Sequence, residues 1–248
     1  MTETTITADV VICTYSFKRW DLLVRAVDSV LSQTVAPKRL IIVVDHNDAL
    51  FQQCREQWGS SHLRRGIEST VTANEFAGRL GSARNTGLLY TASDVVAFLD
   101  DDAEATPNWL ETLLGVYRTH PEAVAVGGAP RPNYGGRRPD WFPPEFDWVF
   151  GCHYSSLPDH LAPIPHLIGA SMSVRRDAIL AAGGFHADDH DDMDLSHRIA
   201  HEHGAQAVLY EPRAEIRHFV PAERLTWSYF WRRCFNINRS KAGVVEHM

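Results

Sequence analysis

The sequence predicts an α/β fold with a mixed, mainly parallel, Rossmann-like central sheet flanked by helices. Short apolar runs rich in β-branched residues, such as "DVVICTY" at residues 9–15, alternate with segments whose apolar residues repeat at helical spacing. This alternation is typical of βαβ units, whose strands are parallel. The chain has 248 residues, 44% of them hydrophobic, which is enough to bury a core in one large domain.

The first half of the chain carries the clearest alternation. Strands are expected at residues 9–15, 39–45, 67–73, 94–100 and 123–129, and helices at residues 19–34, 49–58, 82–93 and 106–120. We expect the third helix to open on Ser82 and the fourth to use Thr106 as its N-cap. Ligands of such sheets bind at the carboxyl ends of the strands, which places Tyr15, Asp45 and residues 100–102 at one rim.

The second half begins with an irregular segment. Residues 131–165 are rich in proline, glycine and aromatic residues and show no clear period, as in a functional loop or a disordered segment. A strand and a short helix follow within residues 167–185, and then a helix at residues 191–204 that ends at Gly204. The remaining pattern predicts two short strands, at residues 205–212 and 214–220, and an aromatic-rich helix at residues 223–243.

Composition limits the partners and the compartment. The formal net charge of −7 and a pI of about 6.0 argue against nucleic acid as a partner. The four cysteines are far apart and form no C-x-x-C pair, which predicts reduced thiols rather than disulfides or a zinc site. No signal-peptide pattern is seen, and no apolar run approaches the roughly 20 residues of a membrane-spanning helix. We therefore expect a cytoplasmic protein with at most peripheral membrane contact.

A run of three carboxylates is the first candidate site. The apolar strand in "VVAFLDDDAE" (residues 95–104) ends at Asp100, Asp101 and Asp102 with no basic residue beside them. Adjacent negative charges repel one another, and burial increases this cost. A hard divalent cation such as Mg²⁺ or Mn²⁺ would offset it, because such ions bind carboxylates together with phosphate oxygens. The alternative is a solvated turn.

A second acidic cluster, "HADDHDDMDLSHR", occupies residues 186–198 at the start of a predicted helix. One interpretation is helix capping, since carboxylates stabilise a helix N-terminus. A calcium loop is another, but the cluster lacks the glycine and the closing glutamate of an EF-hand. The third is a general base next to the helix start.

The ordered set of motifs resembles glycosyltransferase family 2, a family of inverting, GT-A-fold enzymes that use nucleotide sugars. The resemblance covers almost the whole chain and rests on "VVICTYSFKRWDLLVRAVDSVLSQT", "LIIVVDHND", "LGSARNTGLLYTASDVVAFLDDDAEATPNWLE", "IGASMSVRRDAILAAGGF" and "DDMDLSHRI". It implies a single GT-A domain over residues 1–248. Residues 1–129 would bind the nucleotide sugar, residues 130–221 would face the acceptor, and residues 222–248 would form a C-terminal helix.

The resemblance assigns roles to the acidic residues. It implies that Asp100 and Asp102 form the D-x-D pair, with Asp102 as the direct ligand of Mg²⁺ or Mn²⁺ and Asp100 facing the ribose or a metal-bound water. His218 matches a late metal ligand of many relatives, although a lone histidine is also commonly structural. Asp192 matches the catalytic base of the Glu/Asp-Asp motif, and Asp191, which replaces the commoner glutamate, is the alternative base.

The nucleotide contacts follow in the same way. Tyr15 either lies against the nucleotide base or packs at the strand end, and Asp45 either accepts the imide N–H of uracil or thymine or caps a turn. Arg84 and Asn85 either bind the diphosphate or cap a helix. Thr14 and Asp101 are also expected at the nucleotide.

Two further groups have open roles. The aromatic residues of the irregular segment either form an acceptor platform or anchor the loop: Trp141, Phe142, Trp148 and Tyr154. The terminal helix either packs against the domain or touches a membrane, and its basic residues are placed to close over the diphosphate: Arg232, Arg233, Arg239 and Lys241.

The resemblance therefore implies an inverting transferase that moves a sugar from a UDP- or dTDP-sugar to an acceptor hydroxyl with a divalent metal. The acceptor is a glycan, a lipid-linked molecule or a small molecule. Two alternatives stay open. A nucleotidyltransferase would need a glycine-rich loop for the triphosphate, and "TYSFKRWD" contains no glycine. A non-catalytic relative that only binds nucleotide sugar would not need the acidic residues that this chain retains.

Overall fold

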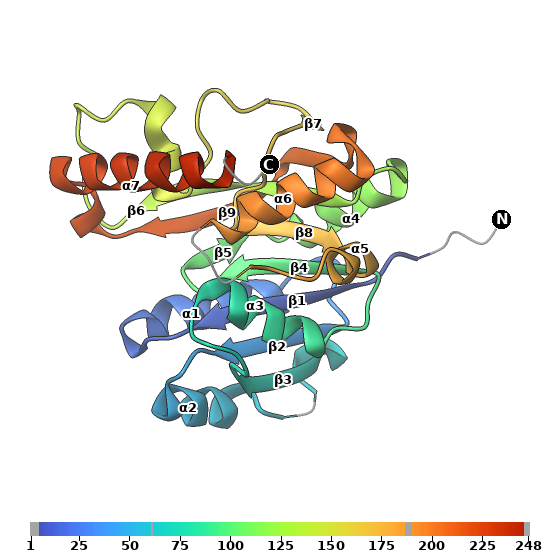
Figure 1. Ribbon diagram of the computed structural model, residues 1–248. Coiled ribbons are helices and arrows are strands. Elements are labelled where there is room, and N and C mark those ends of the chain that lie inside the picture. Colours follow the sequence, from blue (N-terminus) through green and yellow to red (C-terminus); the bar gives the residue numbers. More distant parts are fainter. Residues whose placement is uncertain (1–4, 61, 187–189, 246–248) are drawn as a thin grey trace.

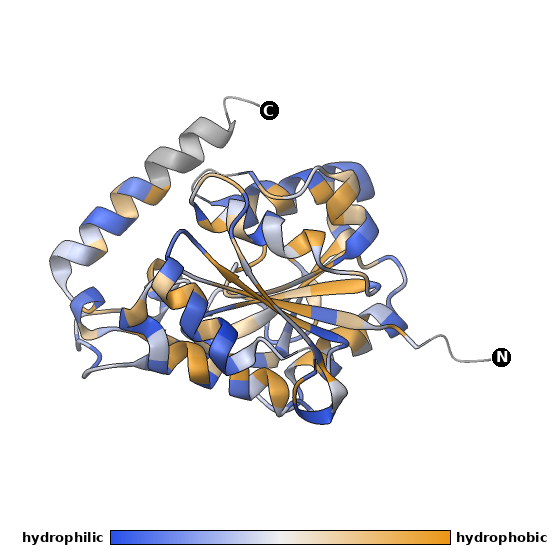
Figure 2. Cartoon of the chain, turned by 90° about the horizontal axis from the view of Figure 1, so that it is seen from below, coloured by the Kyte–Doolittle hydropathy of each residue, from blue (hydrophilic) through white to orange (hydrophobic). Residues whose placement is uncertain are grey.

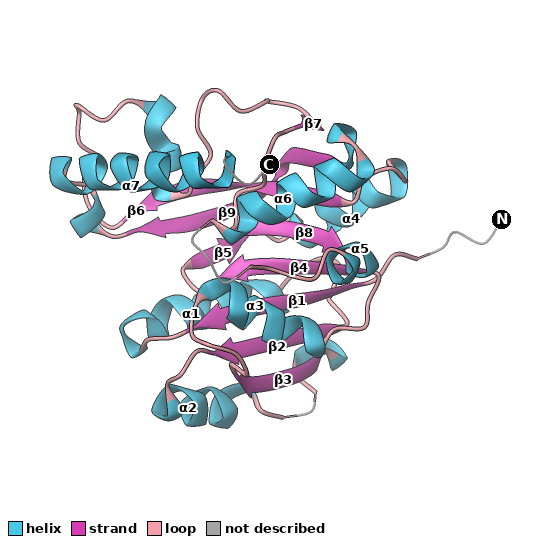
Figure 3. Cartoon of the chain, in the orientation of Figure 1, coloured by secondary structure: helices cyan, strands magenta, loops and turns pink. Residues whose placement is uncertain are grey.

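The strands form one continuous sheet at the centre of the protein. The computed structural model describes residues 5–60, 62–186 and 190–245, and the side chains of the last helix as far as Ile237. Within these residues the sheet has nine strands in the order β3-β2-β1-β4-β8-β6-β9-β5, with β7 paired to β9 (Figures 1 and 3). The strands are β1 (Ala8–Thr14), β2 (Arg39–Val44), β3 (Glu68–Ala73), β4 (Val95–Asp100), β5 (Ala103–Ala105), β6 (Ala125–Tyr134), β7 (Ala162–Pro163), β8 (Ser171–Arg175) and β9 (Val208–Val220).

The sheet is mixed, as the sequence predicts. Strands β3, β2, β1 and β4 are parallel, while β8 runs antiparallel to both β4 and β6. Strand β9 is parallel to β6 and antiparallel to β5 and β7. As a result β1, β2, β4 and β9 all end on the same side of the molecule, at the left in Figure 1.

Helices cover both faces of the sheet because the apolar runs of the strands are buried on both sides. Val10 and Ile12 of β1 face one core, whereas Val11 between them faces the other, as the twofold period of a strand requires. The first core packs against α1 (Trp20–Leu31), α2 (Asp48–Trp58) and α4 (Trp109–Thr119). The second packs against α3 (Leu80–Leu89), α5 (Arg176–Ala181) and α6 (Asp191–His203).

The irregular segment and the last helix form a smaller unit above the carboxyl ends of the strands. A 3-10 helix at Pro144–Phe150 packs its aromatic residues with those of α7 (Trp227–Val245) in a third apolar cluster. Figure 2 shows α7 along the outer edge of the molecule, while the apolar colours concentrate in the central sheet. In the part of the chain that the structure describes, we find no helix with the length and apolar character needed to cross a membrane.

Several predicted boundaries are wrong. Helix α3 begins at Leu80, two residues before Ser82, whose hydroxyl donates to the carbonyl of Arg79 instead of capping the helix (2.9 Å). Helix α4 begins at Trp109, because the chain first adds the short strand β5 and Thr106 donates to the carbonyl of Glu215 (2.8 Å). Strand β6 continues to Tyr134, into the segment predicted to be irregular.

The two short strands predicted at residues 205–212 and 214–220 are one strand, β9. Its pairing with β6 shifts register between Gly127 and Ala129, which leaves the residues between Tyr210 and Glu215 in a bulge. The Glu-Pro-Arg sequence in that bulge ends the apolar pattern but not the strand. The buried Glu211 carboxylate is satisfied there by the side chain and the backbone N–H of Arg213.

Candidate active site

A cavity of about 470 Å³ lies at the carboxyl ends of β1, β2 and β4, where a ligand site is expected in such a sheet. Walls from α3, α6, β9 and α7 complete it. It brings together ten of the eleven predicted site residues: Thr14, Tyr15, Asp45, Arg84, Asp100, Asp101, Asp102, Asp191, Asp192 and His218. These residues are separated by up to about two hundred positions in the sequence, so the fold rather than the local sequence creates the cluster.

The three adjacent aspartates have separate environments. Asp101 accepts hydrogen bonds from the Thr14 hydroxyl (2.8 Å) and from the Arg19 guanidinium (2.7 Å), so the middle carboxylate is used to hold the loop after β1. Burial raises the pKa of Asp101 to about 6, although Arg19 lowers it. The same Arg19 nitrogen lies 3.2 Å from Asp102 and thereby reduces the repulsion between the two carboxylates.

One carboxylate oxygen of Asp102 has no hydrogen bond. Its Oδ1 is buried and accepts no hydrogen bond, although Nε2 of His218 lies 3.2 Å away as an ion-pair partner. Burial alone would raise the pKa of Asp102, but His218 and Arg19 bring it below the usual value. Burial alone would lower the pKa of His218. The effect of Asp102 is larger, so the pKa of His218 lies well above its usual value. The His218 ion pair is therefore the one contact of this buried oxygen among the described residues, and a bound cation would add a second.

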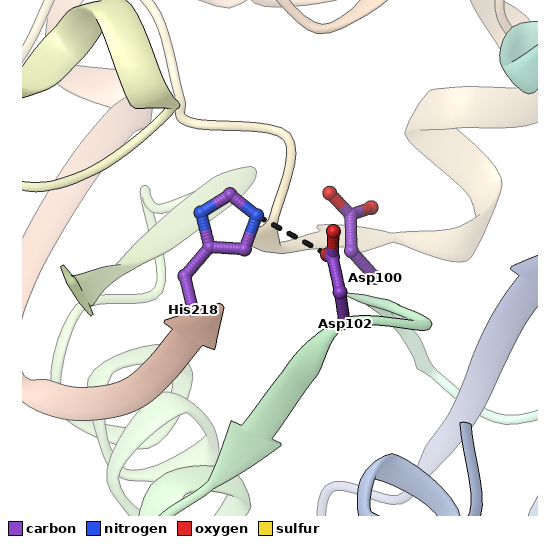
Figure 4. A group of neighbouring side chains, drawn as sticks. All are labelled: Asp100, Asp102 and His218. Carbon is purple, nitrogen blue, oxygen red and sulfur yellow. Dashed lines mark ion pairs between the residues drawn. The ribbon is translucent and has the colours of Figure 1, made fainter. Parts of the chain in front are cut away.

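Asp100, Asp102 and His218 together have the donor set of a metal site (Figure 4). One ligand atom from each residue lies within 4.8 Å of the others. Two carboxylates and an imidazole suit a divalent ion such as Mn²⁺. The pairing of Ala103 with His218 in β5 and β9 fixes this arrangement, and the Phe219 N–H donates to the carbonyl of Asp102 (2.8 Å). Behind the imidazole, Cys152 Sγ lies 3.5 Å from Nδ1 of His218.

Arg84 is buried between the two acidic clusters. Its guanidinium contacts Asp191 (2.9 Å), Asp100 (3.2 Å) and the carbonyl of Gly169 (2.9 Å). Burial lowers the pKa of Arg84, but Asp191 and Asp100 outweigh it, so the pKa lies above its usual value. The Arg84 guanidinium, which the sequence predicts to bind a diphosphate, therefore makes its contacts within the protein. In this position Arg84 orients Asp100 and Asp191.

Asp191 and Asp192 differ in exposure. Asp191 is buried against Arg84, and burial raises its pKa. Asp192 is half-buried on the cavity wall, where it accepts hydrogen bonds from the backbone N–H of Gly169 and of Met193 (both 2.8 Å). A side chain at Gly169 would place its Cβ 2.9 Å from Oδ2 of Asp192, so only glycine fits without a shift. Asp188 and Asp189 of the same cluster lie outside the described residues.

The predicted nucleotide contacts fall in different places. Tyr15 is 55% exposed at the cavity, with the Arg19 guanidinium 5.2 Å from its ring centre. Asp45 lines the cavity and accepts a hydrogen bond from Asn74 (2.7 Å). Asn85 is not among the lining residues. Its amide instead bonds the backbone N–H and carbonyl of Phe185 (2.7 and 2.6 Å) and ties α3 to the segment after α5.

The aromatic residues of the irregular segment mostly anchor it. Phe142 is buried and stacks on Phe150 (ring centroids 4.7 Å apart), and Trp141 contacts α7 rather than the cavity. Phe150, which was not predicted, lines the cavity in their place.

Basic residues around the cavity were only partly anticipated. Arg19 and Arg224 line it and are not among the predicted residues, whereas Arg233 is expected near the diphosphate. The aromatic Tyr229 is a further lining residue that the sequence does not predict. Arg19 ends a 3-10 helix at Phe17–Arg19 that follows β1, and no local feature of the sequence distinguishes it from the other basic residues there. The side chains of Arg239 and Lys241 lie outside the described part of α7.

Comparison with known proteins agrees with this geometry. The family model "Glycosyl transferase family 2" matches residues 9–181. Glucosyl-dolichyl phosphate glucuronosyltransferase of Haloferax volcanii is 34% identical over 91% of this chain and 73% of that protein.

Two solved structures share the fold. GalNAc-T7 with UDP, GalNAc and Mn²⁺ has a TM-score of 0.67 at 18% identity, and covers 88% of this chain. The mannosyltransferase PcManGT of Pyrobaculum calidifontis with GDP-Man and Mn²⁺ has a TM-score of 0.64 at 19% identity, and covers 89% of this chain. The chain spans 44% and 59% of those two proteins. The α/β architecture, the acidic cavity and the family match together show that this chain belongs to glycosyltransferase family 2.

Proposed function

We propose that the protein is a metal-dependent, inverting glycosyltransferase that moves a sugar from a nucleotide sugar to an acceptor hydroxyl. The family and the relatives named above support transfer from a nucleotide sugar as the reaction class. The observation that carries the metal requirement is the group of Asp100, Asp102 and His218, whose ligand atoms lie within 4.8 Å of one another and in which the buried Oδ1 of Asp102 has an ion pair with His218 but no hydrogen bond. Asp100, Asp102 and His218 would hold Mn²⁺ or Mg²⁺, which acts as a Lewis acid toward a leaving diphosphate.

The other cavity residues have separate proposed roles in positioning the carboxylates, binding the diphosphate and removing a proton. Arg19 holds Asp101 and Asp102 in place, and Arg224 and Arg233 line the cavity with positive charge that suits a diphosphate. Asp192 is the better candidate for the base that removes the proton of the acceptor hydroxyl, because Asp191 is committed to Arg84. A single displacement with such a base inverts the anomeric centre.

For the donor we propose a UDP- or dTDP-sugar. Asp45 and Tyr15 stand at the edge of the cavity formed by β1 and β2, where a carboxylate could accept the imide N–H of uracil or thymine and a ring could lie against the base. The GalNAc-T7 structure contains UDP, whereas PcManGT contains GDP-Man, so a GDP-sugar is the comparison donor.

For the acceptor we propose a sugar carried on a lipid phosphate as the class to test first. The relative from Haloferax volcanii is named for transfer to glucosyl-dolichyl phosphate, and it matches 91% of this chain. Glycans without lipid and small hydroxyl compounds are the comparison acceptors.

The test is transfer, or slow hydrolysis, of UDP-, dTDP- and GDP-sugars with Mn²⁺, with Mg²⁺ and with EDTA, with the product anomer read by NMR. We expect turnover only with a metal and a product of inverted configuration. Asp192→Asn should lower kcat about 100- to 10,000-fold with little change in the KM for the donor. The exposed Asp177→Asn serves as the matched control.

Three results would contradict the proposal. They are a retained configuration, full activity of Asp192→Asn, and the absence of turnover with every donor while nucleotide still binds. The last result would identify a nucleotide-binding protein without catalysis.

A further inference from the structure

Helix α7 exposes a stripe of large aromatic side chains. Trp227, Trp231 and Phe235 recur every four residues, so they lie on one face of the helix. They are 55%, 58% and 66% exposed. Trp141 of the irregular segment is 42% exposed and packs edge-on against Trp227, with ring centroids 4.7 Å apart. We call these four residues the aromatic patch.

Trp227 contacts Trp141 and Phe230, but these contacts leave more than half of its side chain, and of Trp231 and Phe235, exposed. The opposite side of α7 already packs on the body of the protein, where Tyr229 and Phe230 join the third apolar cluster and Ile237 is buried. Figure 2 shows α7 at the periphery, with one side facing away from the sheet. Exposed rings gathered on one surface, rather than scattered singly, mark an interaction site.

The charged side chains that the structure describes on α7 are the basic Arg232 and Arg233, of which Arg233 lines the cavity. The sequence of α7 contains Arg232, Arg233, Arg239 and Lys241 and no acidic residue, whereas the whole chain has a net charge of −7. Arg232 is exposed and directly follows Trp231. A partner that covers this helix face should therefore be apolar and carry negative charge at its surface.

We propose that the aromatic patch docks α7 on the interfacial layer of an anionic phospholipid membrane. Tryptophan rings favour the headgroup region of a bilayer, and arginines beside them attract anionic lipids. A helix with these features lies along the surface rather than crossing it. The charge asymmetry favours this partner over a second copy of the chain, which would bring the same basic helix to the contact.

Docking in this way would also place the cavity close to the membrane. Tyr229 and Arg233, on a neighbouring side of the same helix, line the cavity. A hydroxyl on a lipid-linked molecule could then reach the cavity without leaving the membrane. Membrane binding itself does not rest on the proposed reaction, because it is measured without substrate.

The test is co-sedimentation of the full chain with vesicles of phosphatidylglycerol and phosphatidylcholine, compared with vesicles of phosphatidylcholine alone. We expect binding to the anionic vesicles that weakens with added salt. The triple variant Trp227→Ser, Trp231→Ser, Phe235→Ser should bind more than about tenfold less tightly, since three partly inserted rings are lost. The matched control replaces two exposed leucines of other helices, Leu89→Ser and Leu180→Ser (58% and 43% exposed), and should bind like the original protein.

A second measurement covers the case in which the triple variant does not fold. Lipids brominated in their acyl chains should quench the tryptophan fluorescence of the original protein, and the conservative variant Trp141→Phe, Trp227→Phe, Trp231→Phe should still bind while losing most of the quenching. Unchanged binding of the folded triple variant would overturn the proposal. So would an absence of vesicle binding together with a dimer, seen by analytical ultracentrifugation, that the triple variant abolishes.

Discussion

The three adjacent aspartates show how one short acidic run is divided among separate tasks. Asp101 turns toward Thr14 and Arg19, Asp100 toward Arg84, and Asp102 toward His218. Each carboxylate has a cationic neighbour from another part of the chain, so the repulsion expected from the sequence is largely offset before any ligand binds. Arg19 is central, because one of its nitrogens contacts two of the three carboxylates.

Replacing Arg19 tests this arrangement. We expect Arg19→Met to lower kcat and Mn²⁺ affinity about 10- to 100-fold, because Asp102 loses the group that orients it, while Arg19→Lys retains part of both. The measurements are steady-state kinetics and Mn²⁺ titration followed by electron paramagnetic resonance. Arg25→Met, an exposed arginine of α1 that pairs with Glu104 (3.4 Å), is the control. Unchanged Mn²⁺ affinity in Arg19→Met would show that Arg19 does not orient the ligand.

Replacing Gly169 tests whether Asp192 is the catalytic base. Its backbone N–H holds Asp192, and an added Cβ would lie 2.9 Å from that carboxylate and 3.1 Å from Arg84. We expect Gly169→Ala to lower kcat about 100-fold, because a small displacement of the base is costly, while the fold survives. Gly115→Ala is the control, since its Cβ would meet nothing closer than 3.7 Å. Equal kcat in the two variants would argue against Asp192 as the base.

At the scale of elements, the sequence predicted which segments form strands and helices better than where they begin. Local pattern determines the apolar runs of β1, β2 and β4 and the helical spacing of α1 and α6. The ends of these elements in the structure differ from the predicted ends by at most a few residues. Strand β5, the start of α4 and the continuity of β9 depend on pairing between distant residues, such as Ala103 with His218. Local pattern contains no information about such partners.

The same limit applies to the site. That the carboxylates and His218 lie together at the cavity could be predicted, because the motif resemblance identifies each of them individually. The contacts of Arg84 and Asn85 could not be predicted, because they depend on residues distant in the sequence: Asp191 and Gly169 for the arginine, and Phe185 for the asparagine. The contacts of Arg19 could not be predicted for the same reason, since its partners are about eighty residues away in the sequence.

The bulge between β6 and β9 provides a prediction at this scale. A Cβ on Gly128 would lie 2.2 Å from the carbonyl oxygen of Ala214 and 2.5 Å from the Ser171 hydroxyl, both in neighbouring strands. We expect Gly128→Ala to lower the free energy of unfolding by about 1–3 kcal/mol, measured by urea denaturation. Gly115→Ala, in the middle of α4, should leave it unchanged or raise it slightly. Equal stability of the two variants would mean that the β6–β9 contact is looser than described.

At the scale of the molecule, the sheet gathers one cavity from segments far apart in sequence. Strands β1, β2 and β4 supply one rim, α6 supplies the acidic pair, and β9 and α7 supply His218, Tyr229 and Arg233. The third apolar cluster joins the irregular segment to α7, so the last helix is held over the cavity by packing rather than by the sheet. Ligand binding should therefore stabilise the whole chain, because it links both parts of the wall.

This linkage can be measured by thermal unfolding. With a nucleotide at about 100 times its Kd, binding adds about 2.7 kcal/mol, which corresponds to a rise in Tm of roughly 5–10 °C for a chain of this size. We expect this rise with UDP or dTDP only when Mn²⁺ or Mg²⁺ is present, since the diphosphate and the carboxylates repel one another without it. Asp102→Asn should lose the rise relative to its own Tm without ligand, which we expect to be lower than that of the original protein because His218 and Arg19 lose their buried partner. An equal rise in EDTA would separate nucleotide binding from the acidic site and remove the argument for a metal there.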